Sequence, residues 1–581
     1  MCRRRWQNEA FAKYIKPYWG YICLTMLIKL LASLAELWIP SLMEIMLRKD
    51  VIASGTQKVV FYGVLMVLCA VGALIMHITS NRLCAVTSGK ITRKLRHDLF
   101  DKLQQLSSRQ MDQITVASAE SRLTSDTYNV NQMLARIQRM GIRAPSLLIG
   151  GIIMMFSKDS TMALILVGLL PLVCLVVIIV TKYSVPLHTK QQTVLDKVVR
   201  VVQENITGSR VIKALSKTEH EKKRFHGVNQ ELSDIGLKAG LITGASNPVT
   251  TVLMRVGLVL AVLLGAWKVN DGKMETSVIV AALQYFVMIV NAMMGVTRIF
   301  VMWAKGEASA NRIGQVLETP ADLLVLPLEE EVPEKAPHIQ FKDVSFSYTG
   351  VGKNLDSLSF SLDHGQTLGI LGPTGSGKST VLNLLMRLYD PDSGGIYLDG
   401  RDIRTIPNEE LRKKFGVVFQ NDFIAAGDIA GNIRYFRQLE NADLERAAVH
   451  AQAGFIAEKE GGMQAEVVVR GNNLSGGQKQ RLLIARALAA DPEILVLDDA
   501  SSALDYATDA ALRRALRENF RHTTTVLVAQ RVSSLRHADL ILVLDDGAVL
   551  GMGTHEQLME SCEEYRIIAE TQMGEGEEVA V

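Results

Sequence analysis

The sequence has 581 residues, more than one ordinary globular core holds, so we expect at least two domains. Apolar residues make up 48% of the chain, its mean hydropathy is +0.17 and its formal net charge is only +3. No basic block dominates, which excludes a typical nucleic-acid-binding protein. The six cysteines are scattered, which favours small buried side chains over a disulfide framework or a metal site.

The chain begins with a basic and then amphipathic stretch, "MCRRRWQNEAFAKYIK". It lacks the short apolar core and small-residue cleavage site of a secretory signal, so we expect no removable leader. The pattern favours a helix that lies along the cytoplasmic face of a membrane.

Apolar stretches dominate the first half of the sequence and approach or exceed the ~20 residues that a spanning helix needs. They cover roughly 18–46, 57–86, 139–157, 160–182, 242–268 and 275–303. We therefore predict a six-helix transmembrane domain over 1–317. Lys- and Arg-rich links and the basic start predict a multi-pass protein of the cell membrane, with both termini and the second domain in the cytoplasm.

Two of the links between apolar stretches are long, about 87–138 and 183–241, and helix-like in composition. We interpret them as spanning helices that continue into the cytoplasm. Short segments at their turns, near 111–123 and 208–220, are candidates for contact with a soluble domain.

Ionisable residues in apolar spans are costly and usually face an interior. Lys29 and Glu36 are seven positions apart, hence on one helix face, and can pair within the helix or across helices. Two interpretations stay open, a polar substrate cavity and structural pairing between helices. The same two interpretations hold for the ionisable residues His77, Arg255 and Arg298. Four methionines of the last span are either flexible lining of the cavity or ordinary packing: Met288, Met293, Met294 and Met302.

Hydropathy falls after Lys305, and a Pro- and Glu-bearing linker is expected over 318–337. From 338 to 573 strands, Gly-rich turns and helical segments alternate, which predicts an α/β phosphate-binding domain. The tail, 574–581, is expected to be disordered. The predicted fold class is thus a membrane α-helical domain, six helices with long cytoplasmic extensions, fused to an α/β P-loop domain.

The strongest motif is "TLGILGPTGSGKSTVLNLLMRL", an apolar strand, a glycine-rich loop and a helix. The glycines let backbone N–H groups point inward, and the helix N-terminus favours an anion. Lys378 is expected to reach the β- and γ-phosphates of a nucleotide, and Ser379 to coordinate Mg²⁺. The remaining loop residues expected to hold the nucleotide are Gly372, Thr374, Gly375, Ser376, Gly377 and Thr380.

Two further segments belong to the same chemistry. The buried strand "ILVLDDA" places Asp498 at its carboxyl end, where a second carboxylate for the metal is expected. In "NNLSGGQKQRLLIARAL" a Ser-Gly-Gly opens a helix and makes a second anion site. Two phosphate sites far apart in sequence suggest that one serves the nucleotide of a partner.

These motifs resemble those of ATP-binding cassette (ABC) transporters, and six spans before a C-terminal cassette resemble an exporter-type half-transporter. The resemblance implies ATP and Mg²⁺ as ligands, the lipid bilayer and a second half-transporter as partners, and a transport ATPase activity. It also implies roles for an adenine-stacking aromatic, a metal-contacting glutamine, the signature sequence and the interface aspartate: Tyr348, Gln420, Ser475, Gly476, Gly477, Gln478 and Asp505.

Two positions depart from the family pattern. Asp499 stands where the family has the glutamate that acts as base, and Gln530 stands where it has a histidine near the γ-phosphate. A base displaced by about 1 Å costs about 10²-fold in rate, and an amide cannot become cationic. Val469 stands where an acidic residue is common in the loop before the signature.

The combination resembles the degenerate-site subunit of heterodimeric bacterial multidrug exporters. The implied partner carries the standard Glu and His, and the intact signature here completes its hydrolytic site. Small amphipathic compounds are the implied cargo. The alternatives left open are an importer of siderophore-like cargo with the same fold, a lipid or peptide exporter, a homodimer with two impaired sites, and a regulatory nucleotide sensor that does not hydrolyse ATP.

Overall fold

The computed structural model describes residues 12–328, 333, 335–350, 352–420 and 423–573. Two compact units divide the chain, one formed by 1–104 with 117–319, the other by 105–116 with 320–581. The expected tail, 574–581, and most of the expected N-terminal surface helix lie outside the described residues, as does part of the linker.

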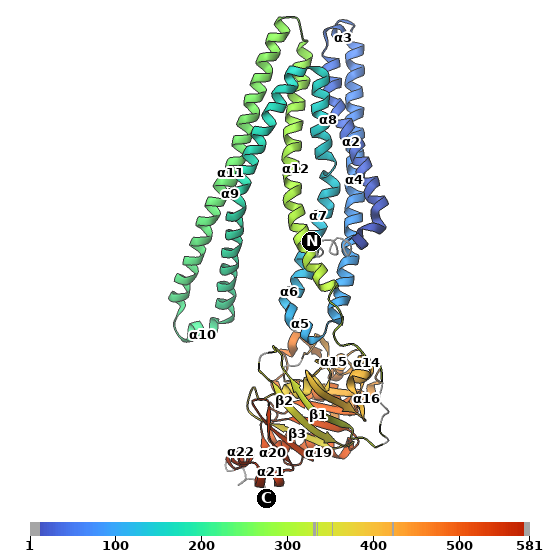
Figure 1. Cartoon of the computed structure of the whole chain (residues 1–581), viewed down its shortest axis with the longest axis vertical. Helices are drawn as coiled ribbons and strands as arrows, with labels where there is room; N and C mark the ends of the chain where they lie inside the picture. Colours follow the sequence, from blue (N-terminus) through green and yellow to red (C-terminus); the bar gives the residue numbers. More distant parts are fainter. Residues whose placement is uncertain (1–11, 329–332, 334, 351, 421–422, 574–581) are drawn as a thin grey trace. The chain divides into compact units, whose positions relative to one another are not determined.

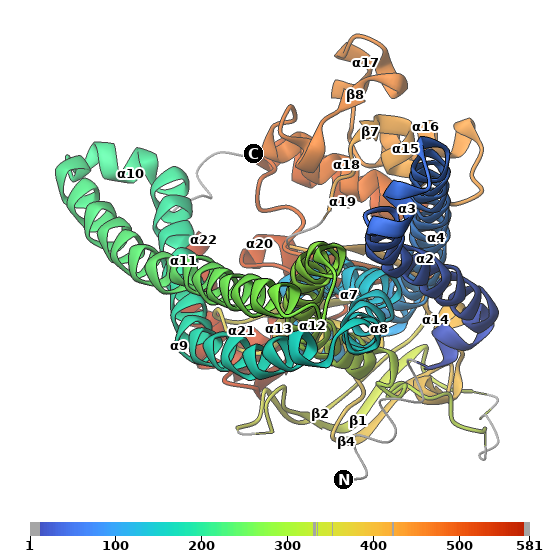
Figure 2. The same ribbon diagram turned by 90° about the horizontal axis from the view of Figure 1, so that it is seen from above.

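The first unit is entirely helical in its described part. Its long helices are α2 (Trp19–Met46), α4 (Thr56–Gln105), α7 (Thr127–Met140), α8 (Arg143–Lys158), α9 (Ser160–Thr207), α11 (Thr218–Asn270) and α12 (Thr276–Leu317). Its short helices are η1 (Lys16–Tyr18), α3 (Lys49–Ala53), α6 (Val116–Ser121), the π-helical η2 (Arg122–Asp126) and α10 (Ser209–Ala214). Helices α9 and α11 run side by side and are closed by α10, while α12 packs against α2, α7 and α8 (Figures 1 and 2).

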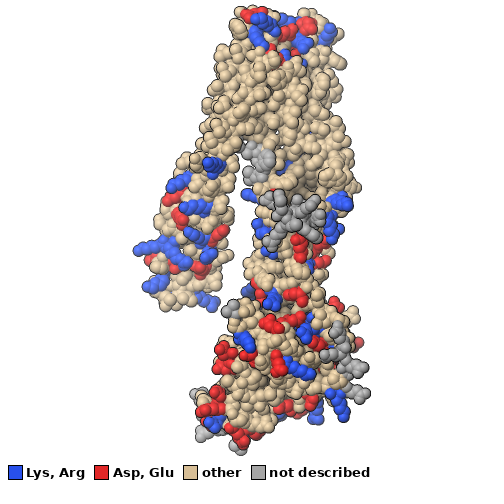
Figure 3. Space-filling view, in the orientation of Figure 1, with Lys and Arg blue, Asp and Glu red and all other residues tan. Residues whose placement is uncertain are grey.

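Six helical segments of the described chain are long and apolar enough to cross a membrane, which confirms the predicted six-span domain. In the helical unit, Figure 3 shows a broad band almost free of charged side chains, with Lys, Arg, Asp and Glu gathered beyond its ends. Helices α4, α9 and α11 continue far past their apolar stretches, as the two long basic links predicted. Tyr285 of α12 donates its hydroxyl to the Leu37 carbonyl of α2 at 2.8 Å, which fixes these two spans to each other.

The second unit is an α/β domain built on two main sheets. The antiparallel sheet has the order β2 (Leu355–Leu362), β1 (Ile339–Phe346), β4 (Ser393–Leu398) and β5 (Arg401–Asp402). The mainly parallel sheet has the order β12 (Ala548–Gly553), β11 (Leu540–Asp545), β3 (Thr367–Leu371), β10 (Thr524–Val528), β9 (Ile494–Asp498) and β6 (Phe415–Val418). A short ribbon joins β7 (Gly427–Asp428) to β8 (Glu466–Val467).

Helices surround these sheets in the second unit. They are α5 (Ser108–Ile114), α13 (Lys378–Leu385), α14 (Asn408–Lys413), α15 (Ile429–Arg434), α16 (Asn441–His450), α17 (Phe455–Glu458), α18 (Gly476–Leu488), α19 (Tyr506–Asn519), α20 (Val532–Leu535), α21 (His555–Ser561) and α22 (Glu563–Met573), with the 3₁₀ turns η3 (Ile403–Thr405), η4 (Gly462–Gln464) and η5 (Val469–Gly471). Strand β9 is buried along its whole length, as its unbroken apolar run predicts for an inner parallel strand.

The order of the parallel sheet positions the site. Strands β3, β10 and β9 are neighbours and run in the same direction, so their carboxyl ends meet at one edge. Ligands of open α/β sheets bind at that edge. The segments that follow these strands carry the phosphate loop, Gln530 and Asp499.

Candidate functional site

The phosphate loop connects β3 to α13 and is shaped by its glycines. Gly375 and Gly377 have φ angles of 90° and 102°, and a Cβ on Gly377 would come within 2.7 Å of the Asn354 carbonyl oxygen. The loop curls around Lys378, whose ammonium donates to the carbonyls of Gly372 and Pro373 at 2.9 and 2.7 Å. The loop backbone therefore surrounds the Lys378 ammonium, whose positive charge favours binding of an anionic ligand.

The loop opens onto a cavity of about 510 Å³ that Gly372, Thr374, Lys378 and Gln530 help to line. Ser376 contributes a buried hydroxyl oxygen that has no hydrogen-bond partner among the described residues. An unpaired polar atom beside glycine-shaped backbone fits a phosphate-bearing ligand.

A hydroxyl and a carboxylate lie together where a metal is expected. Ser379 at the start of α13 donates to a carboxylate oxygen of Asp498, the last residue of β9, at 3.2 Å. Gln420 is exposed just past β6, the neighbour of β9, so its chain position brings it to the same sheet edge. Oxygen ligands of this kind fit Mg²⁺, which would be held by Ser379, Asp498 and Gln420 and would neutralise charge on the phosphates.

Burial dominates the electrostatics of this carboxylate. Asp498 is only 7% exposed, and its burial raises the pKa of the carboxyl above the ordinary value, whereas the Ser379 hydrogen bond lowers it. Burial in turn lowers the pKa of Lys378, although Asp498 and Asp499 oppose that shift. A bound divalent cation would relieve the cost of keeping Asp498 ionised.

The two unusual residues contact each other directly. The Gln530 side-chain amide donates to a carboxylate oxygen of Asp499 at 3.2 Å. Asp499 has a left-handed φ of 52°, and its N–H donates to the Val528 carbonyl of β10 at 3.0 Å. Burial raises the pKa of Asp499, while Lys378, Arg531 and the Gln530 amide lower it. The position at which the family resemblance leads us to expect a hydrolytic base thus holds an aspartate whose carboxylate already accepts a hydrogen bond from a neutral amide.

The signature segment has a capped helix start that stays exposed. Ser475 accepts a hydrogen bond from the Gln478 N–H at 3.3 Å, and the Gln478 side chain reaches back to the Ser475 N–H at 3.1 Å. Ser475 and Gly476 are exposed, and Gly477 is packed so that a Cβ would lie 3.0 Å from the Ala503 carbonyl oxygen. The exposed N-terminus of α18, a helix of 13 residues, offers its first backbone N–H groups as candidate donors to an anion.

A residue that sequence reasoning missed ties the signature helix to the segment after β9. Gln480 accepts a hydrogen bond from the Ala503 N–H at 2.9 Å and donates to the Ser502 hydroxyl at 3.0 Å. Asp505 caps α19 by accepting from the N–H of Thr508 at 2.9 Å. The sequence offered one signal for the role of Gln480: it lies two residues after Gln478, near the start of the helix that the signature opens.

Tyr348 is half-buried just after β1. Its hydroxyl accepts from the Asn383 amide of α13 at 3.0 Å, and its ring meets Phe346 and Tyr389 edge to face. The ring is thereby held beside the helix that follows the phosphate loop.

Val469 is 62% exposed in η5, next to Arg470 with its left-handed φ of 62°.

Helix α5 belongs to the same compact unit as the α/β domain, although it lies between α4 and α6 in the chain. The Tyr389 hydroxyl donates to the Asp112 carboxylate of α5 at 2.6 Å, and Gln110 donates to the Pro320 carbonyl at 2.7 Å. Asp112 lies in the first segment that sequence reasoning proposed, near 111–123, and Gln110 lies just before it. The second, around α10, belongs to the helical unit and leaves Val211 and Leu215 exposed.

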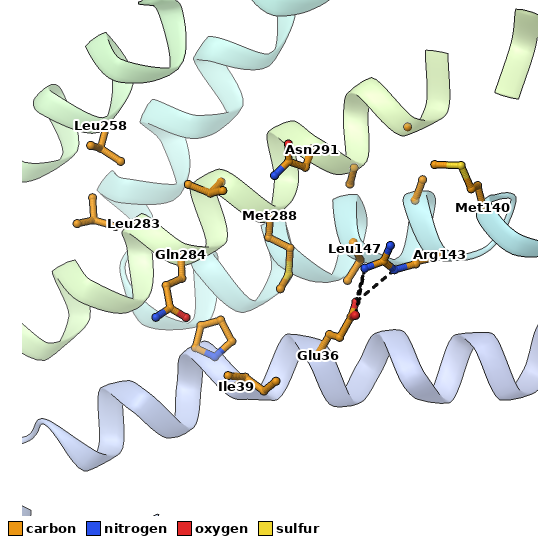
Figure 4. Close-up of a pocket in the computed structure, with 15 residues that line it drawn as sticks. Glu36, Ile39, Met140, Arg143, Leu147, Leu258, Leu283, Gln284, Met288 and Asn291 are labelled. Carbon is orange, nitrogen blue, oxygen red and sulfur yellow. Dashed lines mark hydrogen bonds and ion pairs between the residues drawn. The ribbon is translucent and has the colours of Figure 1, made fainter. Parts of the chain in front are cut away.

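The helical unit contains a cavity of about 640 Å³ (Figure 4). Glu36 of α2 points toward Arg143 of α8 and accepts from its guanidinium at 3.1 Å, and His77 lies 2.8 Å from the same carboxylate. Glu36 therefore pairs across helices, whereas Lys29 donates to the Asn81 side chain at 3.1 Å. Around the ion pair the wall is mainly apolar, with Gln284 and Asn291 as further polar groups: Ile39, Pro40, Met140, Ala144, Leu147, Leu258, Leu283, Val287, Met288, Ala292 and Gly295.

The other candidate cavity residues fall elsewhere. Arg255 is exposed on α11, Met293 is buried in the helical core, and Met294 and Met302 are half-buried on α12. The side chain of Arg298 lies outside the described residues. The ion pair of the cavity thus involves Arg143, which sequence reasoning did not single out.

Comparison with known proteins matches both units. Residues 18–293 match the family model described as ABC transporter transmembrane region, and residues 355–502 match the one described as ABC transporter. The ABC transporter ATP-binding protein YfiB of Bacillus subtilis (strain 168) is 33% identical, covering 97% of this chain and 99% of that protein. The chain belongs to the ABC transporter family.

Further relatives give the architecture in more detail. The ATP-dependent lipid A-core flippase of Vibrio vulnificus (strain YJ016) is 31% identical over 495 residues, which is 84% of each chain. A solved structure of a bacterial Atm1-family ABC exporter with ATP bound matches with a TM-score of 0.81 and 24% identity, covering 96% of this chain and 99% of that one. The fold is therefore that of an exporter-type half-transporter, with a multi-pass membrane domain and an ABC ATPase domain.

Proposed function

We propose that this ABC transporter chain is the degenerate-site subunit of an unequal exporter pair. Its own phosphate loop binds Mg²⁺-ATP and turns it over slowly, while its signature segment completes the hydrolytic site of a second half-transporter. Closure of the two ATPase domains around nucleotide drives the membrane helices, and hydrolysis at the partner's site resets them.

The hydrogen bond between Gln530 and Asp499 carries this proposal. Asp499 is one methylene shorter than glutamate, and one of its carboxylate oxygens already accepts a hydrogen bond from the Gln530 amide, so the amide occupies a lone pair that a hydrolytic water would have to donate to. Lys378, Ser379 and Asp498 meanwhile keep the arrangement that binding requires. Loss of turnover with retention of binding is the chemical consequence.

The cavity supports amphipathic small molecules as cargo. Its apolar wall suits a hydrophobic body, and the Glu36–Arg143 pair offers one ionic group of each sign to a polar head. The relative named as a lipid A-core flippase also concerns an amphipathic molecule, which supports the same cargo class. We place both termini and the ATPase domain in the cytoplasm, because the basic links favour that side.

The test is steady-state ATP hydrolysis by the purified chain alone and together with a co-encoded half-transporter. We expect the chain alone to be nearly inactive and the pair to be active. The control is the pair with Lys378→Ala in this chain, which removes the cation that holds the phosphates. The proposal is wrong if the chain alone hydrolyses ATP as fast as the pair.

A further inference from the structure

Three potential metal ligands meet at one end of the antiparallel sheet; one of them, His364, precedes β3, whereas the phosphate loop follows that strand. His338 directly precedes β1, His364 lies in the turn between β2 and β3, and Asp399 lies in the turn between β4 and β5. The register explains why they meet, because Ile339 pairs with Leu362 on one side and Leu398 on the other. Their ligand atoms all lie within 4.8 Å of one another.

His338 holds a buried nitrogen without a partner. The residue is fully buried, its Nδ1 lies 2.6 Å from the Thr524 hydroxyl, and its Nε2 has no hydrogen-bond partner among the described residues. A buried polar atom left unpaired costs free energy, so such atoms are rare unless a ligand or water satisfies them.

The surroundings of Thr524 select the tautomer of His338. The Thr524 hydroxyl accepts from the Gly365 N–H at 3.1 Å and donates toward the Asp363 carbonyl at 3.5 Å. Its remaining lone pair is satisfied when His338 donates Nδ1–H to it. The Nε2 of His338 then carries a bare lone pair, the arrangement found in histidines that bind metal through one nitrogen and donate the other N–H to an outer group.

The other two ligands are accessible and linked to the first. The His364 Nε2 lies 2.8 Å from an Asp399 carboxylate oxygen, and the Asp399 N–H donates to the His338 carbonyl at 2.9 Å. The His364 ring stacks on the His338 ring with a centroid separation of 3.8 Å. A metal lies in the plane of each imidazole that binds it, so His364 has to rotate out of the stack. Its side chain is 63% exposed on a turn and is free to do so.

We infer that His338, His364 and Asp399 form a binding site for a borderline divalent cation such as Zn²⁺. Two imidazoles and one carboxylate are ligands that zinc accepts, with water in the fourth position, whereas Mg²⁺ prefers oxygen alone. Tetrahedral bonds of about 2.0–2.2 Å separate ligand atoms by about 3.3 Å, which a small movement of the two exposed turns can reach. This inference does not depend on the proposed transport function.

A cation here would join four segments of the ATPase domain. His338 is where the chain coming from α12 and the linker enters β1, and Thr524 is the first residue of β10. The site would thus fix the entry of the linker to both turns and, through Thr524, to the parallel sheet. A ligand that binds only the folded state raises its stability.

The experiment is a titration of the full-length chain in nanodiscs with Zn²⁺, after chelator treatment, in excess Mg²⁺ and without nucleotide. We expect one Zn²⁺ per chain and a higher apparent Tm of the ATPase domain with Zn²⁺. The variants His364→Ala and Asp399→Asn should each weaken binding at least about tenfold and abolish the Tm shift. Asparagine tolerates the left-handed φ of 50° at position 399, so that variant preserves the turn.

The matched control is His220→Ala, which removes an exposed histidine of α11 in the other unit and should leave binding unchanged. Unaltered ATP binding by each variant verifies its fold. A visible absorption band with Co²⁺ in place of Zn²⁺, present in the wild type and lost in both variants, provides a second readout. The inference is overturned if the chain takes up no stoichiometric Zn²⁺, or if both variants bind it as the wild type does.

Discussion

Asp498 shows how one buried carboxylate links nucleotide binding to stability. Because burial raises its pKa, the folded chain holds a proton on this group more readily than the unfolded chain does. The nucleotide-free protein therefore loses stability as the pH rises from the ordinary aspartate pKa through the raised one, and at neutral pH it carries the cost of an ionised buried group.

We predict that Asp498→Asn raises the apparent Tm of the nucleotide-free chain at neutral pH and removes most of the Tm increase caused by ATP with Mg²⁺. Differential scanning fluorimetry with and without Mg²⁺-ATP measures both effects. Asp546→Asn, at an exposed position of the β11–β12 turn, is the control and should change neither. A less stable apo variant that still gains the full Mg²⁺-ATP shift would contradict this account of Asp498.

The ion pair of the membrane cavity is a second prediction at the residue scale. Glu36→Gln and Arg143→Gln should each destabilise the chain, because Glu36→Gln leaves Arg143 without its carboxylate and Arg143→Gln leaves Glu36 with His77 alone. The double variant should cost less than the sum of the two, with a coupling energy of about 1–3 kcal/mol. The free energies of unfolding of the wild type, the two single variants and the double variant, measured in mild detergent, give this coupling energy. Arg255→Gln, at an exposed position of α11, is the control. Strict additivity would show that the two side chains do not interact.

At the element scale, we propose α5 as a segment through which the membrane helices act on the ATPase domain, because it lies between α4 and α6 in the chain. It packs in the same unit as the α/β domain, and Asp112 is hydrogen-bonded to Tyr389, which is 8% exposed and follows α13. Burial and the Asp112 hydrogen bond both raise the pKa of the Tyr389 hydroxyl, so it remains protonated and donates at physiological pH.

We predict that Tyr389→Phe weakens coupling while leaving nucleotide binding intact. A hydrogen bond to a charged group contributes about 1.5–3 kcal/mol, so cargo-stimulated ATPase activity should fall about tenfold or more relative to basal activity. Tyr397→Phe, in the neighbouring strand β4, is the matched control. Equal stimulation in Tyr389→Phe and wild type would exclude this contact from the coupling route.

The elements differ in how far the sequence could predict them. The six spans depend on a short-range hydropathy pattern and were predicted correctly. The phosphate loop and Asp498 also depend on short-range patterns and lie directly after β3 and at the end of β9, while their roles in nucleotide and metal binding stay predictions. The contact between Asp112 and Tyr389 joins residues 277 positions apart, and the one between Glu36 and Arg143 joins residues 107 apart. No local pattern encodes such pairs, since they depend on how distant helices and turns pack.

Asp499 and Gln530 are an intermediate case. Their residue types were readable as departures from a family pattern, but their hydrogen bond follows from the order of the sheet, in which β9 and β10 are neighbours. The His338 cluster likewise depends on the register of β1 with β2 and β4.

At the scale of the whole molecule, the phosphate loop and the signature segment of this chain are proposed to serve two different nucleotide sites of the pair. In the pair, the phosphate loop here belongs to the slow site and the signature here belongs to the fast one. The two segments should therefore respond unequally to substitution.

We predict that Ser475→Ala in this chain lowers ATP hydrolysis by the pair about tenfold or more, because it removes the cap that orders the exposed start of α18. Lys378→Ala should reduce the amount of nucleotide bound per pair and lower turnover less than Ser475→Ala does. Turnover assays combined with nucleotide-binding stoichiometry measure both. Equal effects of the two substitutions would indicate two equivalent sites.

The most direct test of the central claim is ATP hydrolysis at this chain's own site after Asp499→Glu and Gln530→His are introduced together. The pair carries Glu→Gln at the partner's hydrolytic base, so that only this site can turn over. We expect negligible hydrolysis with the unaltered chain and a rise on the order of 10²-fold with the double substitution. Fast hydrolysis by the unaltered chain in that background would show that Asp499 is an adequate base and that the site is not degenerate.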